Sequence, residues 1–116
     1  MSIYHNRSTN VSLYNNTTAT LDASASWSGS YEVSHEFLGL SIYADTSGTA
    51  TIKWSQDKTN VDYTETIDVN ASTETYKVYE QKCDYFKVSF ENDAVEQTVF
   101  RLNTFLREQG GLFEAK

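Results

Sequence analysis

The sequence predicts an all-β fold, an antiparallel and jelly-roll-like β-sandwich of about eight short strands. Apolar and polar residues alternate with a period of two in several short runs, which is typical of half-buried strands. Turn-forming Asn, Asp, Ser and Gly cluster between these runs, and the 116 residues contain no Pro. No stretch keeps a helical period over three turns. A chain of this length forms one domain with a substantial core.

The clearest predicted element is a β-hairpin over residues 40–57. Its turn has Asp45 where a type I turn starts and Gly48 where a left-handed residue closes such a loop. We therefore expect the two flanking strands to pair with each other. Because alternate side chains share one face of a strand, we assign part of the apolar set to the core: Ile42, Ile52 and Trp54.

The segment before the hairpin contains short extended pieces. Residues 31–36 allow an irregular crossover or a short helical turn, and Gly39 in a strand pattern indicates a bulge or a close backbone approach. Strands are expected over residues 11–14 and 18–23, with a further extended piece from Ala25.

Four strands are expected after the hairpin. In the first of them Glu65 falls at an apolar position of the alternation, which predicts a bulge or an exposed end. In the second, Tyr76 and Val78 set the apolar face. All connections are short, so consecutive strands should mostly pair antiparallel. The expected strands cover residues 61–69, about 75–79, 85–90 and 97–106.

The predicted organisation is a polar N-terminal arm over residues 1–10, a β-sandwich domain over 11–107 and a C-terminal tail over 108–116. The formal net charge of −7 argues against nucleic acid as a partner, because phosphates require Lys and Arg patches. Cys83 is the single cysteine, so no internal disulfide forms. No signal peptide and no apolar run of membrane-spanning length is visible, so we expect synthesis in the cytoplasm of a cell, without membrane insertion.

No catalytic, cofactor-binding or metal-binding residue is predicted, and we expect the protein not to be an enzyme. The two histidines, His5 and His35, belong to no recognisable triad or metal motif. Carboxylates near turns could gather around calcium, but capping the turns is the favoured interpretation. These carboxylates are Asp45, Asp57, Asp62 and Asp93.

The aromatic residues allow two further interpretations. Five of them could form a platform that stacks on sugars: Trp27, Trp54, Tyr43, Tyr63 and Tyr79. Trp54, however, shares its side of the strand with the core residues, whereas Tyr43 and Tyr79 lie on the opposite side and are expected to be exposed. An exposed aromatic strip binds either a glycan or a protein partner, and the sequence leaves both open.

Several segments together resemble a β-sandwich domain of virion proteins from tailed bacteriophages and large DNA viruses. The similarity covers roughly residues 26–106 and includes Ser47-Gly48-Thr49, Ser55-Gln56-Asp57, Tyr85 to Val88, and Gln97 to Leu102 after Asn92. A weaker likeness links Ser55 and Asp57 to the S-x-D-G-x-x-W turn of discoidin-like carbohydrate-binding sandwiches. Here Lys58 replaces the Gly and Val61 the Trp, so no ligand residue carries over.

The resemblance implies a non-enzymatic virion structural protein, a minor capsid or decoration protein, located in the virion. Its expected partners are other capsid proteins and further copies of itself. The alternative is a carbohydrate-binding module for attachment to the host surface, with a glycan as partner. Contacts are expected at the chain ends and at exposed tyrosines: Ile3, Tyr4, Tyr43, Tyr79, Leu112 and Phe113.

Overall fold

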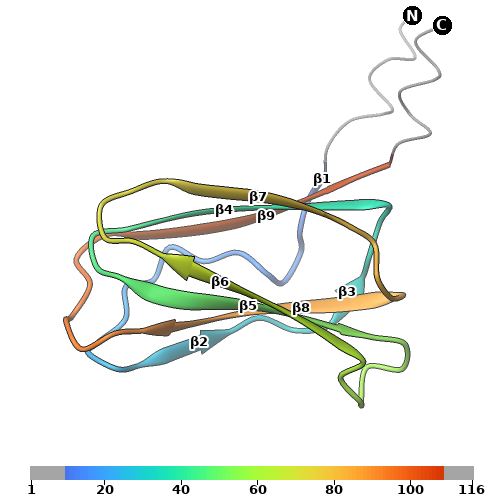
Figure 1. Cartoon of the computed structure of the whole chain (residues 1–116), viewed down its shortest axis with the longest axis horizontal. Coiled ribbons are helices and arrows are strands. Elements are labelled where there is room, and N and C mark those ends of the chain that lie inside the picture. Colours follow the sequence, from blue (N-terminus) through green and yellow to red (C-terminus); the bar gives the residue numbers. More distant parts are fainter. Residues whose placement is uncertain (1–9, 109–116) are drawn as a thin grey trace, which may run out of the picture.

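The structure is a computed structural model that describes residues 10–108. Two antiparallel sheets stack face to face (Figure 1). The described part contains no helix, and hence none long and apolar enough to cross a membrane. The predicted all-β sandwich is thus confirmed. Sheet A contains, in order, β1 (Asn10–Val11), β9 (Phe100–Arg107), β4 (Phe37–Ala44) and β7 (Thr75–Glu80). Sheet B contains β2 (Ser26–Ser28), β8 (Tyr85–Asn92), β5 (Gly48–Ser55) and β6 (Tyr63–Val69), and β3 (Glu32–Val33) also pairs with β8.

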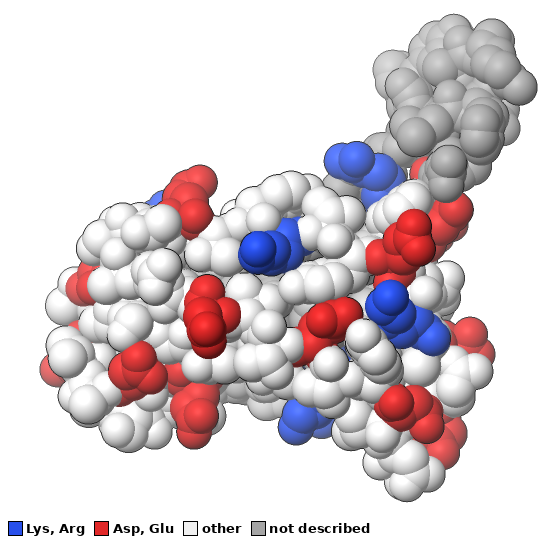
Figure 2. Space-filling view, viewed as in Figure 1, with Lys and Arg blue, Asp and Glu red and all other residues white. Residues whose placement is uncertain are grey.

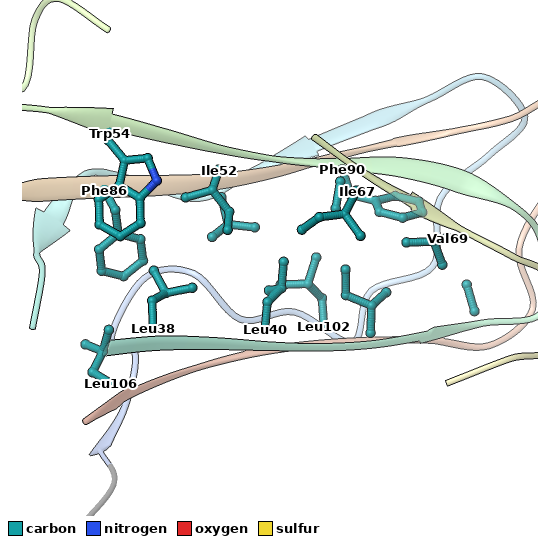
Figure 3. Packing of buried hydrophobic residues seen from close by; sticks show 14 of the residues in the cluster. Leu38, Leu40, Ile52, Trp54, Ile67, Val69, Phe86, Phe90, Leu102 and Leu106 are labelled. Carbon is teal, nitrogen blue, oxygen red and sulfur yellow. The ribbon is translucent and has the colours of Figure 1, made fainter. Parts of the chain in front are cut away.

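The core lies between the two sheets. Figure 3 shows Leu38 and Leu102 of sheet A facing Ile52, Trp54 and Phe86 of sheet B. All five side chains are fully buried, and burying each one stabilises the fold by roughly 1.5–3 kcal/mol. The assignment of Ile42, Ile52 and Trp54 to the core is therefore confirmed.

The expected pairing of the central hairpin is wrong. β4 pairs with β7 and β9, whereas β5 pairs with β6 and β8, so the intervening loop connects the two sheets. Alternation puts apolar side chains on one face of each strand, but it does not determine whether two strands lie side by side in one sheet or in two sheets that face each other. Here they lie opposite, across the core. Thr46 connects this loop to the end of β8, because its buried hydroxyl donates to Asn92 Oδ1 at 2.7 Å.

Gly48 is not left-handed, since no glycine of the described chain has a positive φ. The position requires a residue without a side chain because β8 packs closely against it. A Cβ atom at this position would lie 2.4 Å from Phe90 Cζ and 2.6 Å from the Glu91 carbonyl oxygen. The glycine therefore lets β5 begin directly against β8, where Gly48 is the partner of Asn92.

Other strands also differ from expectation. The β5–β6 register runs without interruption, so the bulge predicted at Glu65 is absent and this half-buried residue lies opposite Ile52. The faces of β7 are reversed, because Tyr79 is the partner of inward-facing Leu38. Tyr76 and Val78 consequently point outward. Of the first expected strand, over residues 11–14, only Val11 lies in a strand. No strand forms over 18–23, and β3 replaces the helical turn considered for 31–36.

A buried polar cluster fills the gap between β2 and β3 along the edge of β8. At Val88, between the two short strands, the backbone N–H donates to Asn15 Oδ1 at 2.8 Å. The Val88 carbonyl oxygen accepts from the Gly29 N–H, also at 2.8 Å. The fully buried Asn15 side chain thus takes the place of a strand backbone.

Asn15 also joins Glu32 and the opposite sheet. The Asn15 Nδ2 donates to Glu32 Oε1 at 2.7 Å and to the Ser30 carbonyl oxygen at 2.9 Å. The backbone carbonyl oxygen of Asn15 accepts from Thr104 Oγ1 of β9 at 2.8 Å. The buried Glu32 carboxylate further accepts from the Tyr14 N–H at 3.0 Å and from the Ser12 hydroxyl. Because each of these buried groups has a partner, the cluster ties the N-terminal segment to both sheets.

Asp57 closes the β5–β6 loop. Its Oδ1 accepts from the backbone N–H groups of Asn60 and Thr59, each at 2.8 Å, and its Oδ2 accepts from Asn60 Nδ2 at 2.9 Å. These bonds, led by the Asn60 backbone, hold the pKa of Asp57 well below its usual range. The carboxylate therefore caps the turn, in agreement with the favoured interpretation.

Asp57 makes the stability of the fold sensitive to acid. Because its pKa is lower in the folded chain than in the unfolded chain, its contribution is complete above about pH 4 and is lost as the pH falls further. We expect the difference in Tm between the wild type and Asp57→Asn to shrink from pH 5 to pH 2. Asp68→Asn, at an exposed carboxylate of β6, is the control. Parallel pH curves for the wild type and Asp57→Asn would contradict this role.

Candidate functional site

An apolar row crosses the outer face of sheet A. Cross-strand pairing places Val11 beside Phe105, Phe105 beside Gly39, and Gly39 beside Val78, so the row includes all four strands. Val11 is 57% and Val78 54% exposed. We call Val11, Phe105, Gly39, Val78 and the adjacent Tyr76 the sheet A strip.

Tyr76 lies over the glycine of the strip. A Cβ atom on Gly39 would be 3.0 Å from Tyr76 Oη and 3.5 Å from two ring carbons. The close approach predicted at Gly39 was that of a backbone, but the neighbour is a side chain, and the unbroken register excludes the alternative of a bulge. The ring, on a residue that is 57% exposed, continues the apolar surface where the row has no side chain of its own.

Charged residues border the strip. Half-buried Phe37 lies between Arg107 of β9 and Glu80 of β7 in the next cross-strand row. Half-buried Tyr43 lies beside Arg101, whose guanidinium carbon is 5.1 Å from the ring centroid. An apolar centre with a charged rim is the composition of a protein contact surface.

A hollow of about 510 Å³ extends this apolar surface around the β1 end of the sandwich. Val11 belongs to both the hollow and the strip. Leu13 and Val33, which are 77% and 61% exposed, line the hollow together with Leu106. His35 lies at its rim, with Nδ1 2.5 Å from Glu108 Oε2. The two apolar features therefore meet at Val11.

The structure separates the predicted aromatic platform. Trp54 is buried, and Trp27 and Tyr79 pack against the core. Tyr43 is half-buried on sheet A, whereas Tyr63 is exposed on β6 of sheet B. The expected exposure of Tyr79 is wrong, because its strand is turned over; burial and then the charge of Glu65 raise its pKa.

Four predicted contact residues, Ile3, Tyr4, Leu112 and Phe113, lie outside the described residues, so their role stays a prediction. The sequence interpretation missed the strip residues Val11, Phe105 and Val78. The outward orientation of these residues follows from cross-strand register and from the orientation of β7, and neither is encoded in a local pattern. The signal available in the sequence was the pair of large apolar residues at alternate positions of β7, Tyr76 and Val78, but the sequence interpretation assigned them to the wrong face.

The Asp45 carboxylate has structural partners of its own. Asp45 accepts from the Thr98 hydroxyl at 2.5 Å and from the Val99 N–H at 3.1 Å, and these bonds lower its pKa. Burial raises the pKa of the Cys83 thiol.

Within residues 10–108, no three His, Cys, Asp or Glu side chains gather in a way that could hold a metal ion. Acidic side chains are spread over the face shown in Figure 2.

Comparison with known proteins identifies the fold and the family. A crystal structure of PBSX exported protein XepA superimposes with a TM-score of 0.71 and 18% identity, over 92% of this chain and 38% of that chain. This chain thus spans about 38% of that structure, and the likeness shows a shared fold. No curated protein matches the sequence. The family model described as "Uncharacterised protein YqxG N-terminal domain" matches residues 2–107. The chain therefore belongs to the YqxG N-terminal domain family.

Proposed function

We propose that the chain is a non-enzymatic structural domain of a phage particle, a minor capsid or decoration protein that acts through protein contacts. The observation that carries the proposal is the sheet A strip, an apolar row across four strands in which Val11, Tyr76 and Val78 are exposed. Two likenesses support it: the fold shared with PBSX exported protein XepA, and the sequence resemblance to virion β-sandwiches. A rigid sandwich with one apolar outer face is suited to packing between neighbouring subunits.

The partner of the strip is a second copy of the chain. The bordering charges are separated across the width of the face, with Arg101 and Arg107 on β9 and Glu80 on β7. A two-fold axis parallel to the strands places the β9 half of one copy over the β4–β7 half of the other. Arg107 then faces the partner subunit's Glu80, which lies in the same cross-strand row, while the two apolar rows stack, which makes the surface self-complementary.

The self-association is tested by placing a charge in the strip. Val78→Asp is expected to weaken the dimer roughly 30-fold, about 2 kcal/mol, because the carboxylate would be buried without a partner. Sedimentation equilibrium over the micromolar range measures the effect. Thr66→Asp, on the exposed edge strand of sheet B, is the matched control and should dimerise as the wild type does. A wild type that stays monomeric, or two variants that behave alike, would refute the interface.

The location in a particle requires a separate experiment. Mass spectrometry of purified phage particles should detect the chain at a fixed ratio to the major capsid protein. Its absence from particles would overturn the virion assignment even if the dimer forms. Sheet A variants that dimerise poorly should also be depleted from particles.

A further inference from the structure

The outer face of sheet B holds two lysines in direct opposition. Lys53 of β5 and Lys87 of β8 are cross-strand partners, and both are half-buried. Like charges in this position weaken strand pairing. Neither ammonium group forms an ion pair with a carboxylate of residues 10–108. An anion bound between the two lysines would remove this repulsion.

Two tyrosine rings lie close to lysine ammonium groups in this region. Lys87 Nζ lies 4.6 Å from the ring centroid of Tyr31, and Lys58 Nζ lies 4.8 Å from that of Tyr85. Lys58 has a φ of 66°, in the left-handed region that costs a residue with a Cβ roughly 1–2 kcal/mol. The β5–β6 loop therefore has a lysine, and not a glycine, in this left-handed position.

A groove leads away from the lysine pair. It has a volume of about 320 Å³ and runs over β2, β8 and β5, starting at Lys53. Hydroxyl groups form one cross-strand row on this face: Ser28, Ser89, Thr51 and Thr66. The hydroxyls of Ser89 and Thr51 make no hydrogen bond to the described part of the chain, so they are available to a ligand.

Carboxylates limit what the groove accepts. Glu91 and Asp68 flank Thr49 in the row beyond the hydroxyls. At the lysine end, Asp57 and Asp62 lie near enough to Tyr31 to raise its pKa, after the larger effect of burial. A polymer with a phosphate on every unit would meet this repulsion at both ends. A nucleic acid is therefore disfavoured, whereas a sparsely charged ligand is not.

We propose that the outer face of sheet B binds an acidic oligosaccharide. Its carboxylate or phosphate group lies between Lys53 and Lys87, and its neutral sugars donate to and accept from the hydroxyls of Thr51 and Ser89. This site lies on the opposite side of the sandwich from the sheet A strip. Its failure would therefore leave the proposed self-association untouched, and the converse also holds.

Calorimetric titration with three small sugars tests the ligand class. Sialyllactose carries a terminal carboxylate, lactose 1-phosphate a phosphate, and lactose no charge. One or both acidic sugars should bind at least tenfold more tightly than lactose, and the stronger of the two identifies the preferred anion. Equal binding of lactose, or tighter binding of a single-stranded oligodeoxynucleotide than of either acidic sugar, would overturn the proposal.

Variants then locate the site. Lys53→Gln with Lys87→Gln should weaken binding of the preferred sugar at least tenfold, while the Tm stays equal or rises because the like charges are gone. Thr51→Val should weaken binding several-fold at constant charge. Lys77→Gln, on exposed β7 of sheet A, is the control for net charge. A double variant that binds as the wild type does, or that binds no worse than Lys77→Gln, would refute the site.

Discussion

Replacing Asn15 with alanine is expected to lower the free energy of unfolding by about 4 kcal/mol, which is a large part of the stability of an ordinary domain. The substitution removes the acceptor of the Val88 N–H and the donor to Ser30 and Glu32, all around a fully buried side chain. Each buried group left without a partner costs about 1–3 kcal/mol, and a carboxylate costs more. Urea unfolding followed by tryptophan fluorescence measures the change.

Two further variants isolate the polar cluster. Asn103→Ala makes the same chemical change on the outer face of β9 and should cost less than about 1 kcal/mol. Glu32→Gln combined with Asn15→Ala should cost less than the sum of the single effects, because the charge that Asn15 partners is then absent. If Asn15→Ala and Asn103→Ala unfold at the same urea concentration, the cluster does not hold the edge of sheet B.

Gly48→Ala is expected to destabilise the protein by about 3 kcal/mol, although it adds a single methyl group. The new Cβ would lie 2.4 Å from Phe90 Cζ and 2.6 Å from the Glu91 carbonyl oxygen. The ring is packed in the core, 4.8 Å from the centroid of Phe100, and the carbonyl belongs to the backbone of β8. Neither neighbour can move without disturbing a sheet, so β5 and β8 must separate.

Gly39→Ala provides the matched comparison. The nearest atom there is Tyr76 Oη at 3.0 Å, at the end of an exposed side chain that can turn away. We expect a loss below about 1 kcal/mol, measured by thermal unfolding beside Gly48→Ala. Equal losses at both positions would show that glycine flexibility, rather than the space beside Phe90, determines the effect.

Alternation predicted much of the core but not its arrangement. The residues predicted to face inward in β4, β5 and β8 were correct. In these central strands the two faces differ clearly, because the inner face is buried and the outer face is polar or half-buried. Strand partners were not predictable in the same way. A period of two describes one strand at a time, so the loop after Ala44 was interpreted as a hairpin turn although it connects two sheets.

The candidate surfaces were predicted less well, for the same reason. On edge strand β7 one side is covered only in part, so Tyr76 and Val78 on the outside resemble a core-facing pair. The Lys53–Lys87 contact joins residues far apart in the sequence. Asn15 lies between two expected strands, over 11–14 and 18–23, but its bonding partners come from β8, the segment before β3 and β9.

The alternation of the chain between the sheets determines how this fold can form. Among the strands of residues 10–108, only β5 and β6 are neighbours both in sequence and in a sheet, so this part of the chain has one hairpin available to form early. The ladder between β4 and β9 instead joins Phe37 to Arg107 and Ala44 to Phe100, so most of the chain must be present before it forms. Loop-closure entropy must be overcome before this ladder gains any stability. The domain is thus a slow folder, on the order of milliseconds to seconds, and it completes sheet A only after β9 has been synthesised.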